Sequence, residues 1–156
     1  PIQGNVTLRG STANKEKTGH AHLSYGGNNW SGVSSFSRHD FGDLRMGTRG
    51  PEEFLRPNYV ERIGDKDVLV ENTNPLLQVP SGYDQINLMQ KLRFKPSERW
   101  DLQYAFHFSE TSPYSRYDRL IRFRPNGQPR SAEWKYGPQI WMMNHLRARH
   151  VGNGKW

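Results

Sequence analysis

The stretch Tyr83–Ser109 reads YDQINLMQKLRFKPSERWDLQYAFHFS and contains two arms in which apolar and polar residues alternate. In the first arm the even positions from Ile86 to Phe94 are apolar apart from Gln90, and in the second arm the even positions from Trp100 to Phe108 are all apolar. A period of two residues is typical of a β-strand with one apolar face. Pro96 and Ser97 interrupt the pattern, so the stretch predicts a hairpin of two long strands joined by a turn at 95–99.

The length of the two arms points to a membrane-spanning sheet. Each arm has about 10 residues, which at roughly 3.3 Å per residue and a tilt near 45° rises about 25 Å, the height of the apolar band of an outer-membrane barrel. Strands of soluble proteins average about 5 or 6 residues. No apolar run approaches the roughly 18 residues of a membrane helix, so a bilayer would be crossed by strands that form a barrel.

The same alternation recurs on both sides of the hairpin. We expect further strands at Ile2–Arg9, around His20–Tyr25, from Trp30 to near Asp40, and at Ile140–Arg149, with turns at 26–29 and 152–155. The chain is therefore predicted to be all-β and antiparallel, with about six strands and the start of a seventh at Trp156.

The remaining connections are long or polar, at Ser11–Thr18, Phe41–Gly82 and Thr111–Gly137. Structureless connections of this length argue against the strands inside a compact soluble domain. Short turns at one end and long loops at the other are instead typical of an outer-membrane barrel, whose turns are periplasmic and whose loops are extracellular. We expect residues 1–156, which start at Pro1 without an initiator Met, to be part of one barrel domain completed by a longer chain.

Aromatic residues gather beside the predicted turns, because each of three turns is followed by a Trp. Such residues form an aromatic girdle where a barrel crosses the membrane interface. The alternative is ordinary cross-strand aromatic pairing beside a turn. The residues expected at this level are Tyr25, Trp30, Phe94, Trp100 and Trp156.

The composition is basic and rich in aromatic residues, with a formal charge of +7, a pI near 9.9, 12% aromatic residues and a mean hydropathy of −0.93. The chain has no cysteine, which excludes a disulfide scaffold and a thiolate metal site. The charge permits a soluble basic β-protein that binds nucleic acid or polysaccharide. That alternative predicts cations gathered on one face, whereas Lys and Arg scatter through loops, turns and lumen-facing positions, so we expect no nucleic-acid partner.

Three segments together resemble the barrel strands of TonB-dependent receptors of the kind found in Bacteroidetes-like bacteria. They are GHAHLSYGGNNWSGVSSFSRHDFGDLRMG (19–47), GYDQINLMQKLRFKPSERWDLQYAFHFSETSPYSRYDR (82–119) and AEWKYGPQIWMMN (132–144). The amino-acid sequence of these segments is most similar to the branch described as haemoglobin, transferrin or lactoferrin receptors, and to siderophore receptors. The resemblance implies a barrel of about 22 strands closed by an N-terminal plug that is absent from this sequence.

The resemblance also implies a function and a location. Such a receptor lies in the outer membrane of a Gram-negative bacterium, in contact with lipid and lipopolysaccharide, and is energised by the TonB-ExbB-ExbD complex through the missing N-terminal region. Its cargo would be an iron-containing ligand, haem or a ferric siderophore, with glycan import as an alternative. A non-transporting barrel, such as an adhesin or passive porin, has the same strand pattern.

Candidate ligand residues fall into two groups. His20 and His22 are two apart on one strand and, with His107 and the other strand histidines His39 and His145, share the predicted lumen side, where His could bind haem or iron or simply be a polar lumen residue. A loop interleaves aromatic and cationic residues suited to an anionic, ring-bearing ligand, to lipopolysaccharide phosphates, or to solvent. These loop residues are Tyr114, Arg116, Tyr117 and Arg119.

No catalytic arrangement is present in the sequence. There is no Cys nucleophile, no glycine-rich phosphate loop and no His pair at helical zinc spacing, and Glu52-Glu53 is a loop pair suited to solvent. We therefore expect no enzymatic activity, no metal site and no cofactor.

Overall fold

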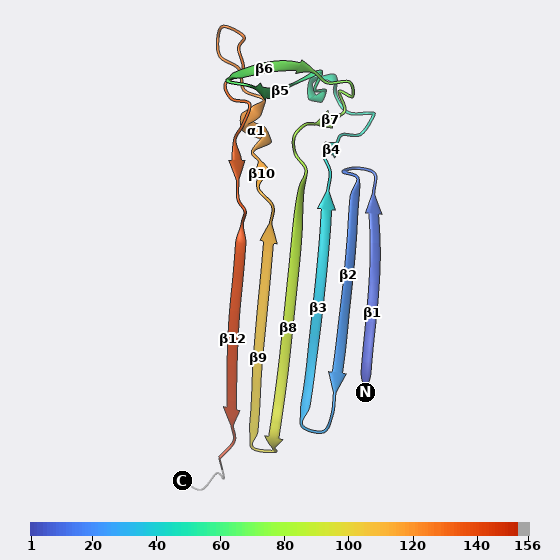
Figure 1. Cartoon of the computed structure of the whole chain (residues 1–156). Coiled ribbons are helices and arrows are strands. Elements are labelled where there is room, and N and C mark those ends of the chain that lie inside the picture. Colours follow the sequence, from blue (N-terminus) through green and yellow to red (C-terminus); the bar gives the residue numbers. More distant parts are fainter. Residues whose placement is uncertain (153–156) are drawn as a thin grey trace.

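The computed structural model describes residues 1–152 and is dominated by one antiparallel sheet (Figure 1). Six long strands lie in it in the order β1-β2-β3-β8-β9-β12, so each is paired with its neighbours along the chain once the loops are set aside. The predicted all-β class and antiparallel strand order are confirmed, while Trp156 and the predicted turn at 152–155 lie partly or wholly outside the described residues. The strands are β1 (Ile2–Ser11), β2 (Glu16–Gly26), β3 (Trp30–Phe41), β8 (Tyr83–Ser97), β9 (Trp100–Thr111) and β12 (Ile140–His150).

The pairing register separates the side chains of the sheet into an apolar face and a polar face. Directly opposed residues point to the same side, and successive residues of one strand point to opposite sides. One row near the middle of the strands contains only apolar residues from all six strands. It consists of Val6, Ala21, Phe36, Leu88, Phe108 and Met142, and it defines the apolar face. The row beside it, on the polar face, consists of Asn5, His22, Ser35, Met89, His107 and Met143.

The apolar face is not covered by protein within the described residues. Val6 is 73% exposed, Met142 is 62% exposed, and even the central Leu88 is 40% exposed. The buried apolar side chains of the described residues, Val60, Leu120 and Ala132, all lie in the connections between strands rather than in the sheet. The sheet therefore presents a continuous apolar surface that some other medium or layer must cover.

Polar groups on the apolar face are paired with one another. The Ser34 hydroxyl donates to Gln90 Oε1 at 2.6 Å, and Gln90 Nε2 donates to the Tyr25 hydroxyl at 2.9 Å. Gly32, opposite Tyr25, has no side chain, and a Cβ there would come within 2.5 Å of the ring, so the glycine lets Tyr25 lie against the backbone. Gln90, which interrupts the apolar alternation of β8, is thus satisfied within the face.

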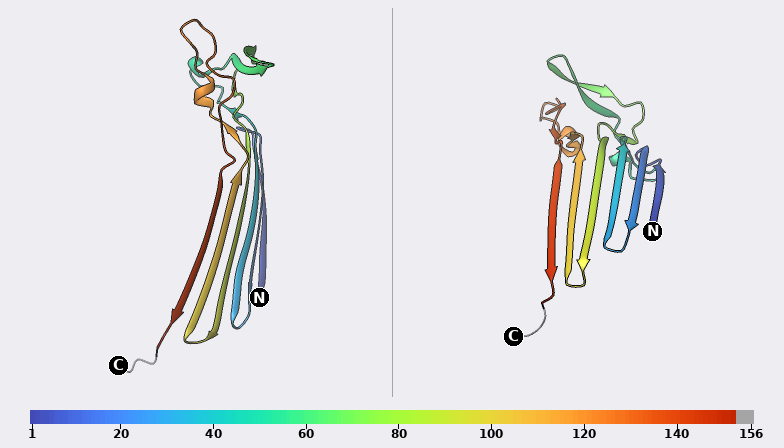
Figure 2. Two further views of the ribbon diagram at one scale, coloured as in Figure 1. Left: turned by 60° about the vertical axis from the view of Figure 1, so that its left-hand side comes forward. Right: turned by 60° about the horizontal axis from the view of Figure 1, so that its bottom comes forward.

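Open hollows lie on both faces of the sheet. On the apolar face, two rows line one of about 510 Å³. On the polar face, a row that crosses all six strands lines one of about 680 Å³. That row contains Gln3, Ser24, Val33, Lys91, Ala105 and His145. Figure 2 shows the twist of the sheet in two further views. Cross-strand hydrogen bonds connect the polar side chains, such as His20 Nδ1 with Ser37 Oγ at 2.7 Å.

At the turn end, the boundary of β8 differs from the prediction. The sequence predicts a turn at 95–99, but β8 continues to Ser97. The pairing of β8 with β9 shifts at a β-bulge between Phe94 and Ser97. Pro96 has no amide hydrogen, and a bulge leaves one residue out of the ladder, so Pro is tolerated there without a lost hydrogen bond. The arms of the hairpin are correspondingly longer than expected.

At the loop end, the two long connections were predicted to be irregular loops, but they contain short strands and helices. The first holds a hairpin of β5 and β6, and the second holds the short helix α1 beside the β10–β11 pair (Figures 1 and 2). Asp43 Oδ1 accepts hydrogen bonds from the amides of Ser81 and Gly82, which joins the two ends of the first connection. No helix among residues 1–152 is long and apolar enough to cross a membrane. The elements are β4 (Leu44–Arg45), η1 (Glu52–Phe54), β5 (Asn58–Ile63), β6 (Lys66–Glu71), β7 (Leu77–Gln78), β10 (Tyr114–Ser115), α1 (Tyr117–Leu120) and β11 (Lys135–Tyr136).

The connection between β1 and β2, expected as a loop at Ser11–Thr18, is shorter in the structure. Both strands extend into it, and β1 and β2 pair as far as Ser11 and Glu16. Lys15 takes a positive φ of 50° to close the remaining turn. The ion pair of Arg9 with Glu16, at 3.3 Å, lies beside this turn and holds the two strand ends together.

Candidate ligand-binding site

The histidines predicted on the lumen side all lie on the polar face, but they do not converge. The rings of His20 and His22 are 6.3 Å apart on β2. His107 is in the same row as His22, yet three strand spacings separate them, about 14 Å. Within residues 1–152, no three His, Cys, Asp or Glu side chains are grouped closely enough to hold a metal ion. These histidines therefore line a surface and do not form one ligand set.

His107 has an aromatic neighbour, Trp141, that was not among the predicted site residues. Its ring meets the Trp141 ring edge-on, with the centroids 6.3 Å apart. Trp141 is opposite Ser109, one row closer to the loops. This contact places His107 at the lower border of an aromatic cluster on the polar face.

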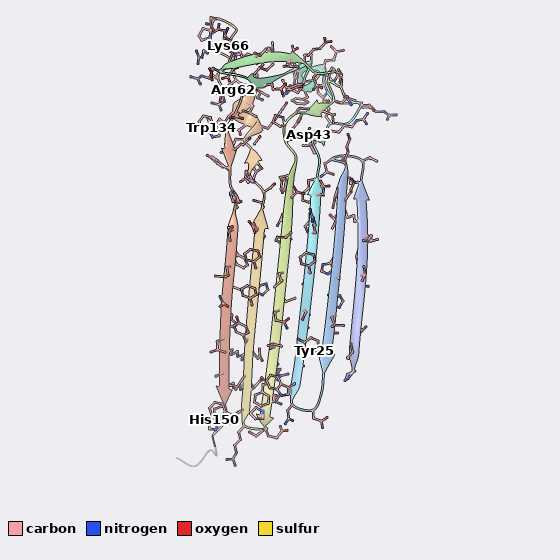
Figure 3. All side chains as sticks on the ribbon, viewed as in Figure 1. Tyr25, Asp43, Arg62, Lys66, Trp134 and His150 are labelled. Atoms are coloured by element: carbon pink, nitrogen blue, oxygen red, sulfur yellow. The ribbon has the colours of Figure 1, made fainter. Side chains whose placement is uncertain are left out.

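The two arginines of the predicted loop site are engaged within the loop. Arg116 donates two hydrogen bonds to the Asp118 carboxylate, at 2.7 and 2.9 Å, and its guanidinium lies 5.0 Å from the centre of the Tyr136 ring. The hydrogen bonds of Arg116 lower the pKa of Asp118 below its ordinary value. Arg119 forms an ion pair with Asp118 at 3.5 Å and lies 5.3 Å from the centre of the ring of Trp134, which Figure 3 labels, although its buried Nε has no hydrogen-bond partner among the described residues. Neither cation is left as a simple free charge for an anionic ligand.

The two tyrosines of the same loop point to different places. Tyr117 begins α1 and lines an apolar pocket of about 330 Å³ between the two long connections, with Val60 and Leu120. Burial raises the pKa of its phenol above the ordinary value. Tyr114 instead faces the sheet, with its ring centre 6.0 Å from that of Tyr83. The four loop residues predicted together are thus distributed over three environments.

Tyr114 belongs to a hollow at the loop end of the polar face, which we call the upper hollow. It has a volume of about 380 Å³ and draws its lining from the upper ends of β8, β9 and β12 and from β10. Because strand residues two apart share a face, the strand contributions arrive in pairs. The lining residues are Tyr83, Gln85, Ser109, Thr111, Tyr114, Gln139 and Trp141.

An aromatic series leads along the sheet to the upper hollow. The rings of His39 and Phe41 stack at 5.5 Å, Phe41 and Tyr83 are 5.0 Å apart, and Tyr114 continues the series to Tyr136 at 6.5 Å. Tyr83 and Trp141 were not among the predicted site residues, because each is a strand residue on the polar face. Their position at the loop end of that face is the signal that distinguishes them from the other residues of the polar face.

The aromatic residues expected at the turn end occupy three successive rows. Trp30 and Phe94 are cross-strand partners whose rings stack at 4.2 Å. Tyr25 is one row nearer the loops, and Trp100, which contacts His150 at 4.5 Å, is one row nearer the turns. Figure 3 shows Tyr25 and His150 at this end of the strands. Both a girdle and simple cross-strand pairing are compatible with this arrangement, and Trp156 lies outside the described residues.

Comparison with known proteins gives no relative from which a role could be transferred. No protein-family model, no curated protein and no solved structure matches the chain. The function therefore has to be argued from the two faces of the sheet and the upper hollow.

Proposed function

We propose that this chain is a section of the wall of an outer-membrane β-barrel, with its apolar face in lipid and its polar face toward a water-filled lumen. The observation that carries the proposal is the combination of a continuous exposed apolar face with an opposite face that carries most of the polar side chains of the strands. In a soluble barrel or sandwich the apolar face points inward to a core, whereas a membrane barrel reverses this arrangement.

The pairing of polar groups on the apolar face supports lipid as its environment. Hydrocarbon offers no hydrogen-bond partner, so a polar group there costs several kcal/mol unless protein satisfies it. The Ser34, Gln90 and Tyr25 side chains satisfy one another, and the Tyr104 hydroxyl donates to Asn144 Oδ1 at 2.6 Å. Water would make such pairing unnecessary.

The charged residues of the apolar face lie near its loop end. Arg38 and Glu110 flank Ile86 in one row, just beyond the row of Leu88. In a barrel this level approaches the interface, where a charge costs about 0–1 kcal/mol rather than the larger amount at the midplane. The distribution therefore agrees with extracellular loops, periplasmic turns and an interfacial role for the aromatic residues near the turns.

The importer role rests on the sequence resemblance. We propose that the complete protein is a TonB-dependent receptor of the outer membrane, energised by TonB-ExbB-ExbD, which imports an iron-containing ligand such as haem or a ferric siderophore. The proposal includes no catalytic step and no cofactor. It includes no nucleic-acid partner.

A glycan is the second candidate cargo, and one observation favours it. The upper hollow has no formally charged residue in its lining and combines aromatic rings with amides and hydroxyls. Sugars present an apolar ring face and many neutral hydrogen-bonding groups, which such a lining can match. Haem and catecholate siderophores are anionic and would instead favour free cations.

The experiment that tests the importer role is growth of the source bacterium with and without the full-length gene. Haem, a ferric siderophore or a glycan is supplied as the sole limiting source of iron or carbon. Loss of growth on haem or siderophore supports the iron receptor, and loss on the glycan alone supports the second candidate. Unchanged growth on all three, with the protein present in the outer membrane, would contradict an import role.

A further inference from the structure

The upper hollow combines three aromatic rings with four neutral polar side chains. Tyr83 and Tyr114 form a tilted pair, with 51° between their planes, while Trp141 stands on the far side of β9. Two rings on one side and one on the other leave a space of about 380 Å³, within the range of roughly 300–1,000 Å³ typical of small-molecule sites. The hollow lies on the polar face of the sheet.

The polar groups of the hollow keep unused hydrogen-bonding capacity. Gln85 Nε2 donates to Asn87 Oδ1 and Ser109 Oγ, which fixes the amide and leaves its carbonyl oxygen with no recorded partner among residues 1–152. Thr111 Oγ1 accepts from the Gln139 amide nitrogen of the backbone at 3.2 Å and retains its own proton to donate. The site thus offers fixed acceptors and donors without a net charge.

The side chains that border the hollow are consistent with a neutral ligand. Arg116 lies beyond Tyr136 and is held by both Asp118 oxygens, so an anion would have to displace an existing bidentate pair. The His107 ring is turned edge-on to Trp141 at the lower border. A ligand in the hollow would therefore contact ring faces and neutral hydrogen-bonding groups before it met a charged side chain.

We propose that the upper hollow is a binding subsite for an uncharged, hydroxylated ring, specifically one sugar unit of a soluble oligosaccharide. The apolar face of the sugar packs against the Tyr114 and Trp141 rings, and its hydroxyls bond to Gln85, Thr111 and Gln139. This inference rests on the proposed function, because it requires the polar face to line a lumen that is open to the outside.

The test uses the full-length protein reconstituted in detergent and titrated calorimetrically with maltohexaose, xylohexaose and chitohexaose, and separately with haem. The variants are Tyr114→Ala and Trp141→Ala. The matched control is Trp134→Ala, which removes an aromatic ring from the connection between β9 and β12, where Tyr114 also lies, but outside the hollow. At least one oligosaccharide is expected to bind, with affinity reduced about tenfold by each variant and within about twofold for the control. Raising the salt concentration should change this affinity little.

Two outcomes would overturn the inference while leaving the barrel intact. One is a folded, membrane-inserted protein that binds none of the three oligosaccharides. The other is oligosaccharide binding that both variants leave unchanged, which would place the sugar elsewhere. A protein that fails to insert into bilayers, as judged by the mobility shift of folded barrels on unheated gels, would count against the proposed function and the subsite together.

Discussion

Replacing Leu88 by Arg tests which face of the sheet meets lipid. Leu88 lies in the row with Phe36 and Phe108, one row from the middle of β8, and its side chain is 40% exposed on the apolar face. If this face lies in lipid, Leu88 is one row, about 5 Å in height, closer to the midplane than Arg38 and Glu110. An arginine there then costs an amount between the interface and midplane values, about 1–3 kcal/mol, which is roughly a 5-fold to 150-fold loss in the folding equilibrium. The same substitution in water would cost little, because the guanidinium would be solvated.

The matched control is Met89→Arg, one residue along the same strand. Met89 points to the polar face between Ser35 and His107, at nearly the same height. The full-length variants would be refolded into phospholipid bilayers and unfolded with urea, with the folded fraction read from gel mobility. We expect a large loss for Leu88→Arg and a small one for Met89→Arg. Equal losses, or a greater loss for Met89→Arg, would refute the assignment of the faces.

Three further predictions follow from contacts at the two ends and on the apolar face. Tyr25→Phe leaves the Gln90 amide with an unpaired hydrogen in lipid and should destabilise the barrel by about 1–3 kcal/mol in the same urea assay; no change would indicate that water reaches this face. Trp30→Ala removes a stacked ring and should cost about 1–2 kcal/mol, most of it restored by Trp30→Phe, whereas equal loss in both variants would contradict a role for the stack. In the β5–β6 hairpin, the hydrogen bond from Arg62 lowers the pKa of Asp67 below its ordinary 3.8, so the carboxylate stabilises the hairpin above that pH and the contribution is lost as the pH falls through the lowered value. Amide exchange of the hairpin, corrected for intrinsic rates, should therefore differ little between pH 7 and 5 and become faster below pH 3.8. The Asp67→Asn variant lacks the carboxylate, so its corrected exchange should not become faster below pH 3.8. An equal increase in both proteins would exclude the ion pair as the cause.

The strands could be predicted from the sequence because their signal is local and repeated. In β9 every second residue from Trp100 to Phe108 is apolar, and in the structure these residues share the apolar face, with Glu110 as the charged residue at its loop end. The exception in β8, Gln90, could not be explained from its own strand, since its partners Ser34 and Tyr25 belong to β3 and β2. Cross-strand pairing of this kind depends on register, which a single sequence leaves open.

The loops were less predictable for two different reasons. The β5–β6 hairpin does carry a local signal, a Gly64-Asp65 turn between two short apolar runs, and Gly64 has the positive φ of 60° that such a turn favours. The prediction of one polar loop at 41–82 did not take this hairpin signal into account. Asn72, by contrast, is buried and donates to the carbonyls of Arg56 and Leu77, contacts that no pattern in the sequence indicates.

The candidate site was predicted in composition but not in assembly. Alternating cations and aromatics around Arg116 suggested an anion site, yet Asp118, two residues away, engages that guanidinium. Of the four predicted loop-site residues, the upper hollow takes only Tyr114; the rest of its lining comes from the ends of β8, β9 and β12, which pairing brings together, and from Gln139 just before β12. A site assembled from three strands requires the register before its members can be named.

The most direct test of the account is the environment of successive residues along β8. Single nitroxide labels at positions 85–94 of the full-length protein in bilayers would be examined for collisions with oxygen, which partitions into lipid, and with a water-soluble nickel complex. We predict an alternation with a period of two, in which labels at Ile86, Leu88 and Leu92 favour oxygen and labels at Asn87, Met89 and Lys91 favour nickel. High nickel accessibility at every position, or the opposite alternation, would contradict the proposal that the apolar face lies in the membrane.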